Sequence, residues 1–376
     1  MFKAVHIAAD DWAHAAKVCA EKLSISDGDP YTLGFLYVSG ALAADITSIL
    51  TFLRQKTGIK HWTGSVATGI CAQGGDGGIP GDYYDRSAVA VMVAQVPEDI
   101  FCTLPTLEKT GDIPVHISQW LAATQSHFGI VHGDPANGNI PSVIDELVER
   151  HTLFLAGGLT SSGGGINYQI ADDVTSGGLS GVLFAPGLSV AAGLSQGCQP
   201  ISRPHIITEC TNNILMALDG RPALEVFSDD IGEDLANDMA SVQGLVHVGI
   251  PIEGSDTGDF MVRTLIGIDV RRGWLAIGEN VNTGEQVLFV RRDRASAEAD
   301  FRAMLENLKE RLSGPPKGGV YYSCIARGPS LFGAEGREIG MIREVIGDIP
   351  LVGFYGNGEI SNSRLYGYTG VLVLFQ

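Results

Sequence analysis

Two turns near the C-terminus carry the side chains best suited to chemistry. Cys324 and Arg327 follow a short apolar run, and the guanidinium of an arginine offers a planar fork of donors that suits a carboxylate. Further along the chain, Tyr355, Asn357 and Glu359 supply a phenol, an amide and a carboxylate between glycines. A guanidinium and a carboxylate presented together could recognise a zwitterion.

Both turns follow predicted strands. If these strands are neighbours in a sheet, the two turns lie at the same sheet edge, where Arg327 would take a ligand's carboxylate and Glu359 its ammonium. Replacing Arg327 by alanine would then weaken binding and leave the protein folded. The alternative is that Arg327 and Glu359 pair with each other.

The elements that must position these turns occur three times along the chain. Each copy has a short apolar strand, an amphipathic helix, a strand that runs into glycine, and a last apolar strand. The first strands are predicted at 35–40, 128–133 and 320–324, the second at 61–65, 153–158 and 350–355, and the last at 88–96, 181–184 and 371–375. First and second strands are about 25 to 30 residues apart, which suits a crossover helix.

The corresponding turns of the first two copies add candidate ligand-binding residues. These are Ser39, Gly64, Ser65 and Gly158. Backbone N–H groups of such glycine-rich turns, together with a few oriented side chains, could enclose a molecule the size of an amino acid.

A different pattern separates the second and third copies. Short strands are predicted at 245–250, 260–268, 273–277 and 286–290, and a helix begins at Ser296. The proline-rich segment 199–204 is the best boundary, which divides the chain into domains 1–203 and 204–376. The fold class expected is α+β, with two lobes of mixed β-sheet and helices packed on their outer faces.

The neighbouring residues of two glycine-rich motifs argue against a catalytic serine and against a phosphate-binding loop. Residues 193–197 match G-x-S-x-G, but Pro200 and Pro204 prevent the helix that a nucleophile elbow needs. The glycine-rich run 74–81 has no lysine, so it predicts a flexible loop or a lid rather than a phosphate-binding site. No catalytic residue, metal ligand or cofactor is predicted from these motifs.

Single histidines and cysteines leave two alternatives open. His132 and His247 lie in apolar strands and could ligate a non-covalent haem, although a lone histidine is more often a core residue. The six cysteines form no C-x-x-C pair and should be reduced thiols. Cys324 or Cys198 could act as a nucleophile, with the charge of Arg327 available to Cys324.

Composition excludes several classes of function. The 376 residues are 45% hydrophobic and carry a formal charge of −18, so the chain should fold and should avoid nucleic acid and anionic membranes. No apolar run reaches the roughly 18 residues that a membrane helix needs. The N-terminus does not read as a secretory signal, so a cytoplasmic location is expected.

Five short runs, taken in order, resemble the FIST sensory domain, with both its N-terminal and C-terminal parts. They are Ser195 to Pro200, Asn280 to Asp293, Ser323 to Gly328, Leu331 to Gly333 and Gly353 to Ile360. The similarity extends from about Tyr31 to Phe375.

The resemblance implies a sensory protein of bacterial signal transduction that binds a small ligand, amino acids being the suggested ligands. Haem-dependent sensing of nitric oxide has also been attributed to stand-alone members. The remaining length holds no kinase, cyclase or methyl-accepting segment, so a signalling partner in trans, such as a histidine kinase or a cyclase, is expected.

Overall fold

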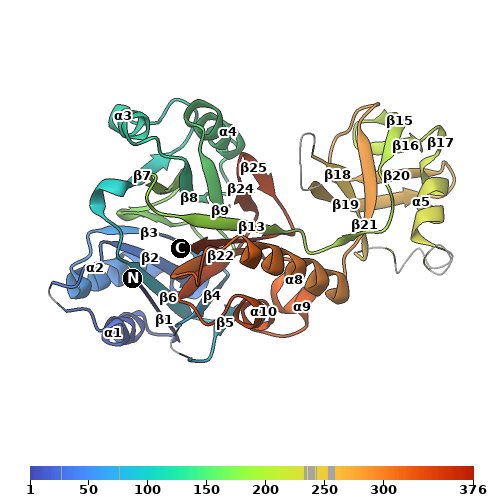
Figure 1. Cartoon of the computed structure of the whole chain (residues 1–376). Coiled ribbons are helices and arrows are strands. Elements are labelled where there is room, and N and C mark those ends of the chain that lie inside the picture. Colours follow the sequence, from blue (N-terminus) through green and yellow to red (C-terminus); the bar gives the residue numbers. More distant parts are fainter. Residues whose placement is uncertain (27, 76, 233–234, 236–241, 243, 253–258) are drawn as a thin grey trace. The chain divides into compact units, whose positions relative to one another are not determined.

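The structure is a computed structural model of residues 1–376, and it describes all of them except 27, 76, 233–234, 236–241, 243 and 253–258. The chain forms two compact units (Figure 1). Unit 1 combines Met1–Ser195 with Arg302–Gln376, and unit 2 is Gln196–Phe301. These units are not the two domains predicted from the sequence, 1–203 and 204–376, because the third copy packs with the first two in unit 1. The units describe spatial contacts, and the predicted boundary between the two sequence domains stays a prediction.

Unit 1 contains three six-stranded sheets. In spatial order the first has β1 (Phe2–Ala8), β6 (Ala88–Ala94), β2 (Leu33–Ser39), β3 (His61–Ala67), β10 (Gln169–Ala171) and β11 (Asp173–Thr175). The second has β25 (Arg364–Tyr366), β24 (Glu359–Ser361), β9 (Phe154–Leu159), β8 (Phe128–Gly133), β12 (Leu179–Phe184) and β7 (Phe101–Leu107). The third has β13 (Val190–Ser195), β26 (Gly370–Phe375), β22 (Gly318–Cys324), β23 (Leu351–Gly356), β4 (Gly69–Gln73) and β5 (Gly81–Tyr84).

The predicted threefold repeat is confirmed. In every copy the first and second strands pair in parallel, as β2 with β3, β8 with β9, and β22 with β23. The last strand of each copy pairs antiparallel with the first, as β6 with β2, β12 with β8, and β26 with β22. The sheets are therefore mixed, and the α+β class expected from the sequence is confirmed.

Each copy gives a β-hairpin to a different copy. The hairpin β4–β5, which follows β3 in the first copy, pairs with β23 of the third. The hairpin β10–β11 of the second copy pairs with β3, and β24–β25 of the third pairs with β9. This cyclic exchange places the third copy in unit 1, although unit 2 separates it from the others in sequence.

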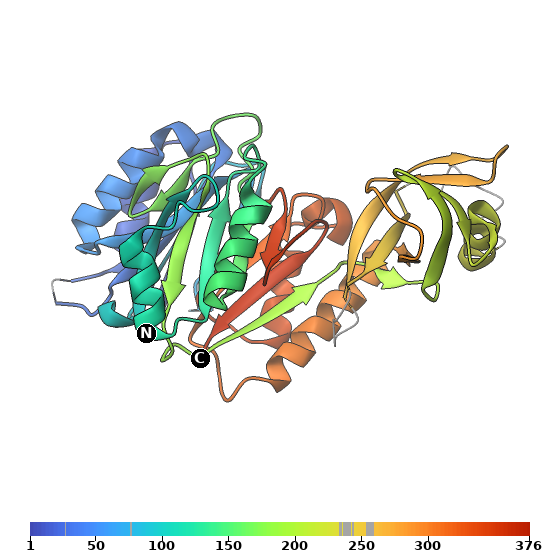
Figure 2. The same cartoon turned by 90° about the horizontal axis from the view of Figure 1, so that it is seen from above.

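Helices cover the outer faces of the sheets, and the inner faces form a common core. In the part of the chain that the structure describes, the helices are α1 (Trp12–Leu23), η1 (Gly40–Asp45), α2 (Ile46–Thr57), η2 (Glu98–Ile100), α3 (Val115–Thr124), α4 (Ile140–His151), α5 (Ala223–Ile231), α8 (Arg294–Glu310), α9 (Gly328–Phe332) and α10 (Arg337–Val345). Helices α1 and α2 lie side by side over the first sheet (Figure 2). The predicted apolar faces are buried at Ile49 and Leu53 in α2, at Ile144 in α4 and at Ile339 in α10.

Unit 2 is a closed antiparallel barrel. Its strands, in order around the barrel, are β15 (His205–Thr211), β16 (Ile214–Leu218), β20 (Trp274–Ile277), β19 (Phe260–Asp269), β18 (Val246–Pro251) and β21 (Gln286–Arg291), which pairs with β15. The short strands β14 (Gln199–Pro200) and β17 (Arg221–Pro222) pair with β21 and β16. Helix α5 buries Val226 and Phe227 in the barrel core. Among the described residues no helix is long and apolar enough to cross a membrane.

Candidate functional site

The structure buries Arg327 and pairs it with a carboxylate that the sequence analysis did not select. The side chain is fully buried, and its Nε donates a hydrogen bond to Oε1 of Glu338 at 2.9 Å. Its Nη1 donates to Oγ of Ser195 at 3.2 Å. The alternative hypothesis of an Arg327–Glu359 pair is therefore wrong, and the Arg327 fork contacts a carboxylate of the protein itself.

Glu338 is the centre of a buried polar network, which we define as Ser195, Tyr321, Ser323, Arg327 and Glu338. Oε1 of Glu338 accepts hydrogen bonds from the hydroxyls of Tyr321 (2.6 Å) and Ser323 (3.1 Å). All five residues are at most 1% exposed. An acid in the first turn of a predicted amphipathic helix was the one sequence signal that could have identified Glu338.

Glu359 lies close to this network, with partners of its own. Its Oε2 accepts hydrogen bonds from the hydroxyl and the N–H of Thr369, at 2.7 and 3.2 Å. Its Oε1 has no hydrogen-bond partner among the residues that the structure describes. Burial raises the pKa of Glu359 to about 8 because a carboxylate loses its hydration there.

The structure distributes the other predicted ligand-binding residues among the three sheets. Gly158 pairs with Glu359 across β9 and β24, and Asn357 donates its amide to the carbonyl of Thr160 at 2.9 Å. Three more belong to the first sheet: Gly64 and Ser65 on β3, and Ser39 at the end of β2. The hydroxyls of Ser39 and Ser65 hydrogen-bond to backbone atoms of the same sheet. No contact in the structure tests whether these residues bind a ligand.

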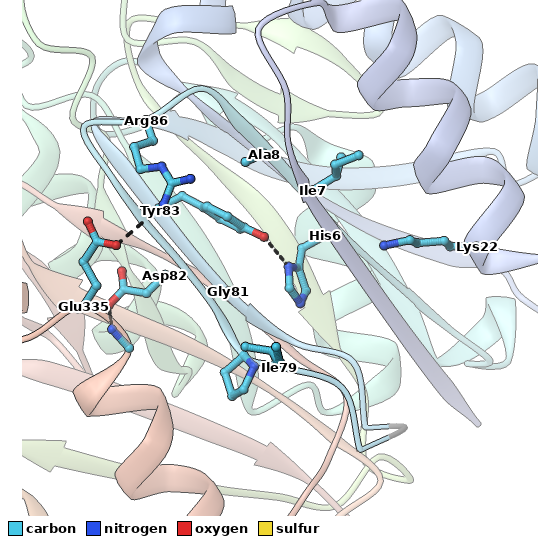
Figure 3. Close-up of a pocket in the computed structure, with 12 residues that line it drawn as sticks. His6, Ile7, Ala8, Lys22, Ile79, Gly81, Asp82, Tyr83, Arg86 and Glu335 are labelled. Atoms are coloured by element: carbon cyan, nitrogen blue, oxygen red, sulfur yellow. Dashed lines mark hydrogen bonds and ion pairs between the residues drawn. The ribbon is translucent and has the colours of Figure 1, made fainter.

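A cavity of about 470 Å³ opens elsewhere on unit 1 (Figure 3). It lies between β1, the end of α1, β5 with its flanking turns, and the turn before α10. Its lining residues are His6, Ile7, Ala8, Lys22, Ile79, Pro80, Gly81, Asp82, Tyr83, Arg86, Glu335 and Gly336. We call it the β5 pocket. Part of the glycine-rich run 74–81, predicted as a loop or lid, therefore forms one wall.

Both signs of charge line the β5 pocket. Arg86 and Glu335 face each other at 3.6 Å, and both side chains are about half exposed. Lys22 extends from α1 towards His6 (Figure 3), and Nδ1 of His6 lies 2.6 Å from the hydroxyl of Tyr83. No local pattern in the sequence indicates these residues, because they come from three distant segments that only the hairpin exchange brings together.

Asp82 joins the β5 pocket to the buried residues behind it. Its Oδ2 accepts a hydrogen bond from the N–H of Gly336 at 2.6 Å, and its Oδ1 accepts one from the hydroxyl of Tyr355 at 3.0 Å. Burial, reinforced by the nearby carboxylates of Glu338 and Glu335, raises the pKa of Asp82 to about 6. Tyr355, a predicted site residue, is thus in direct contact with a side chain of the pocket wall.

A thiolate is disfavoured at Cys324. Burial and the neighbouring carboxyl of Glu359 raise the pKa of its thiol to about 11, and only the thiolate is an effective nucleophile. Ser195 of the G-x-S-x-G run is buried and accepts from Arg327, and the short strand β14 follows it instead of a helix. These observations give no support to Cys324 or Ser195 as a nucleophile, and the role of Cys198 stays a prediction.

His132 sits where the inner faces of the three sheets meet. It occupies the same position in its copy as Tyr37 and Tyr322 do in theirs, three residues after a glycine of the first strand. Its Nε2 is 3.1 Å from the Tyr37 hydroxyl, which is 3.0 Å from that of Tyr322, and its Nδ1 faces Thr63. Because hydroxyls and aromatic rings surround the fully buried imidazole, this position does not fit a haem ligand.

The second candidate haem ligand, His247, lies on β18 of unit 2 and is also buried. Burial, with the charge of Arg292 beside it, lowers its pKa to about 4. Neither histidine is among the residues that line the β5 pocket. Among the described residues no group of three or more His, Cys, Asp and Glu side chains could hold a metal ion.

The burial of His132 predicts a pH-dependent stability. Burial lowers the pKa of its imidazole from 6.5 to about 3, so between these values the unfolded chain binds one more proton than the folded chain. The contribution of the neutral His132 imidazole to the free energy of unfolding is complete above pH 6.5 and falls by about 1.4 kcal/mol per pH unit below it. Urea unfolding of the wild type and of His132→Gln between pH 7.5 and 4.5 measures this difference. Parallel stability curves for the two proteins would contradict the prediction.

Comparison with known proteins gives two kinds of match. The FIST N domain model matches residues 32–221, and the FIST C domain model matches residues 223–362. An uncharacterized protein of Mycobacterium tuberculosis strain H37Rv is 35% identical over 211 residues, which are 54% of this chain and 55% of that protein. An uncharacterized protein of Mycobacterium bovis is 33% identical over 211 residues, 54% of each chain. The match spans about half the length of these relatives.

Proposed function

We propose a ligand-sensing function for this chain, which belongs to the FIST family of signal-transduction sensory domains. The ligand we propose is an amino acid or a similar small zwitterion, bound in the β5 pocket. The observation that carries the proposal is a charged surface cavity whose wall residue Asp82 is hydrogen-bonded to the buried interior of unit 1.

The charges of the pocket support a zwitterionic ligand. Arg86 and Lys22 could donate hydrogen bonds to the carboxylate of a ligand, and Asp82 and Glu335 could accept hydrogen bonds from its ammonium group. The Arg86–Glu335 contact is long and half exposed, and exposed ion pairs of this kind contribute only about 0–1 kcal/mol. A ligand could therefore separate the two side chains at little cost. The volume of about 470 Å³ lies within the range of pockets for small molecules.

We further propose that the chain acts in the cytoplasm through a signalling protein in trans, such as a histidine kinase or a cyclase. The support for this is the family of signal-transduction sensory domains to which the chain belongs. Co-purification of a kinase or cyclase in a ligand-dependent amount would support it. Unchanged recovery of partners with and without the ligand would count against it.

A thermal-shift screen with the twenty amino acids, followed by calorimetry, tests the proposed ligand class. A ligand that binds only the folded chain raises its melting temperature, so at least one amino acid should do so. Failure of all twenty at millimolar concentration would refute this ligand class.

Replacing Arg86 by alanine should weaken binding of that amino acid about 10- to 100-fold, because a charge-assisted hydrogen bond to its carboxylate is lost. Arg86 is more than half exposed, so the melting temperature of the free protein should hardly change. Arg150→Ala is the matched control, since Arg150 is an exposed arginine of α4 with an ion-pair partner in Glu146. Equal affinities of the two variants would place the ligand outside the β5 pocket.

A further inference from the structure

Asp82 is a nearly buried acid without a cation. Only 7% of its surface is exposed, and among the described residues no lysine, arginine or histidine forms an ion pair with it. Its two oxygens accept hydrogen bonds from the Gly336 N–H and the Tyr355 hydroxyl, which are both neutral donors. Two neutral hydrogen bonds compensate a buried negative charge only in part.

The groups around Asp82 disfavour its negative charge further. Glu335, in the turn before α10, and Glu338, in its first turn, are carboxylates that disfavour a third negative charge nearby. Cys71 of β4 and Tyr84 of β5 also interact with Asp82, and both are neutral groups at physiological pH. The side of Asp82 from which a positive charge can approach is the β5 pocket that it lines.

We infer, on the basis of the proposed function, that Asp82 selects a ligand with a protonated primary amine and that the charge of this amine tightens the first turn of α10. The amine adds the missing positive charge, and near pH 6, where Asp82 of the free protein is about half protonated, it shifts this carboxyl group to its ionised form. An ionised carboxylate is a stronger acceptor than a neutral carboxyl group, so the hydrogen bonds from Gly336 and Tyr355 become stronger when the ligand is bound.

The change at Gly336 reaches the buried network directly. Gly336 immediately precedes α10, and Glu338 in the first turn of that helix is the ion-pair partner of Arg327. A ligand shifts such an element only if it binds one of its states more tightly. Here the preferred state is the one with Asp82 ionised and Gly336 bound to it. Ligand occupancy is therefore transmitted as order in α10.

An organic ammonium suits the site better than a metal ion. A bound divalent metal needs several oxygen ligands, and the described residues contain no group of three His, Cys, Asp or Glu side chains that could hold one. A primary ammonium brings three N–H donors, which the carboxylate oxygens of Asp82 and Glu335 can accept.

Hydrogen exchange of the peptide that covers residues 336–345 tests this inference. The probe is methylammonium chloride at pH 6, compared at the same pH and ionic strength with potassium chloride and with tetramethylammonium chloride, which cannot donate a hydrogen bond. In the wild type we expect methylammonium alone to slow exchange at the start of α10, about two- to tenfold, as one strengthened hydrogen bond would do.

Two variants with the same charge change locate the effect. Asp82→Asn should lose the methylammonium response, whereas Asp145→Asn, which neutralises an exposed aspartate of α4 outside the β5 pocket, should keep it. An undiminished response in Asp82→Asn, or an equal loss in both variants, would overturn the assignment of Asp82. If Asp82→Asn does not fold, the comparison of the three salts on the wild type still tests the inference. Equal effects of the three salts on hydrogen exchange would overturn the assignment of Asp82.

The outcomes also separate this inference from the proposed function. If no amino acid binds but methylammonium orders α10 through Asp82, the proposed ligand class fails and the assignment of Asp82 stands. If an amino acid binds equally to the wild type and to Asp82→Asn, the ligand class stands and the assignment fails.

Discussion

Replacement of Arg327 by methionine is expected to lower the free energy of unfolding by about 3–5 kcal/mol. The substitution keeps an apolar side chain in the space but leaves the carboxylate of Glu338, which is 1% exposed, without its cation. The hydroxyls of Tyr321 and Ser323 would remain as its partners. The expectation that a change at Arg327 leaves the protein folded and affects only binding is revised accordingly, because the structure buries the guanidinium completely.

Urea unfolding of three variants measures this effect. Arg327→Met should be strongly destabilised, and the double variant Arg327→Met with Glu338→Gln should recover part of the loss, because no uncompensated charge remains buried. Arg302→Met is the matched control, since the pair of Arg302 with Glu344 is exposed on both sides and should contribute less than about 1 kcal/mol. Similar stabilities of Arg327→Met and Arg302→Met would show that the buried pair is not important for stability.

Replacement of Gly353 by alanine is expected to destabilise unit 1 by about 3 kcal/mol or more. A Cβ atom at this position would overlap the carbonyl oxygen of Tyr321 on the neighbouring strand. Since β22 and β23 are paired in parallel at this point, the backbone itself would have to move. Gly64 and Gly157 meet the carbonyls of Leu36 and Val131 in the same way, so the requirement recurs in all three copies.

Gly340→Ala is the matched control, with an expected effect of opposite sign. Gly340 lies within α10, and a Cβ there would meet no atom within 4 Å. Alanine is a better helix former than glycine, so this variant should be more stable by about 0.5–1 kcal/mol. Thermal and urea unfolding of the two variants provide the comparison. A Gly353→Ala protein as stable as Gly340→Ala would mean that the strands can separate at this point without cost.

The local architecture of unit 1 could be predicted from the sequence alone. Each copy contains all the residues of its strand–helix–strand–strand unit, and the apolar periodicity that defines these elements is a local property. The buried positions Ile49, Ile144 and Ile339 in three predicted helices agree with that analysis. The FIST family could also be recognised, because its runs occur in order along one chain.

The tertiary structure decided which segments meet. The alternation of apolar and polar residues along a strand indicates that one face is buried. It does not indicate which of three similar sheets the strand joins. The exchange of hairpins brought Asp82 of the first copy to Tyr355 of the third. It also brought His6, Arg86 and Glu335 to one cavity.

The partner of Arg327 was decided in the same way. The sequence suggested Glu359 as the partner of Arg327, and the position of α10 against β22 placed Glu338 at 2.9 Å instead. Interactions between charges depend on distance and burial, which are properties of the folded chain. Composition and local pattern therefore determined the elements and the family of this protein, and the packing of the three copies determined its ion pairs and its pocket.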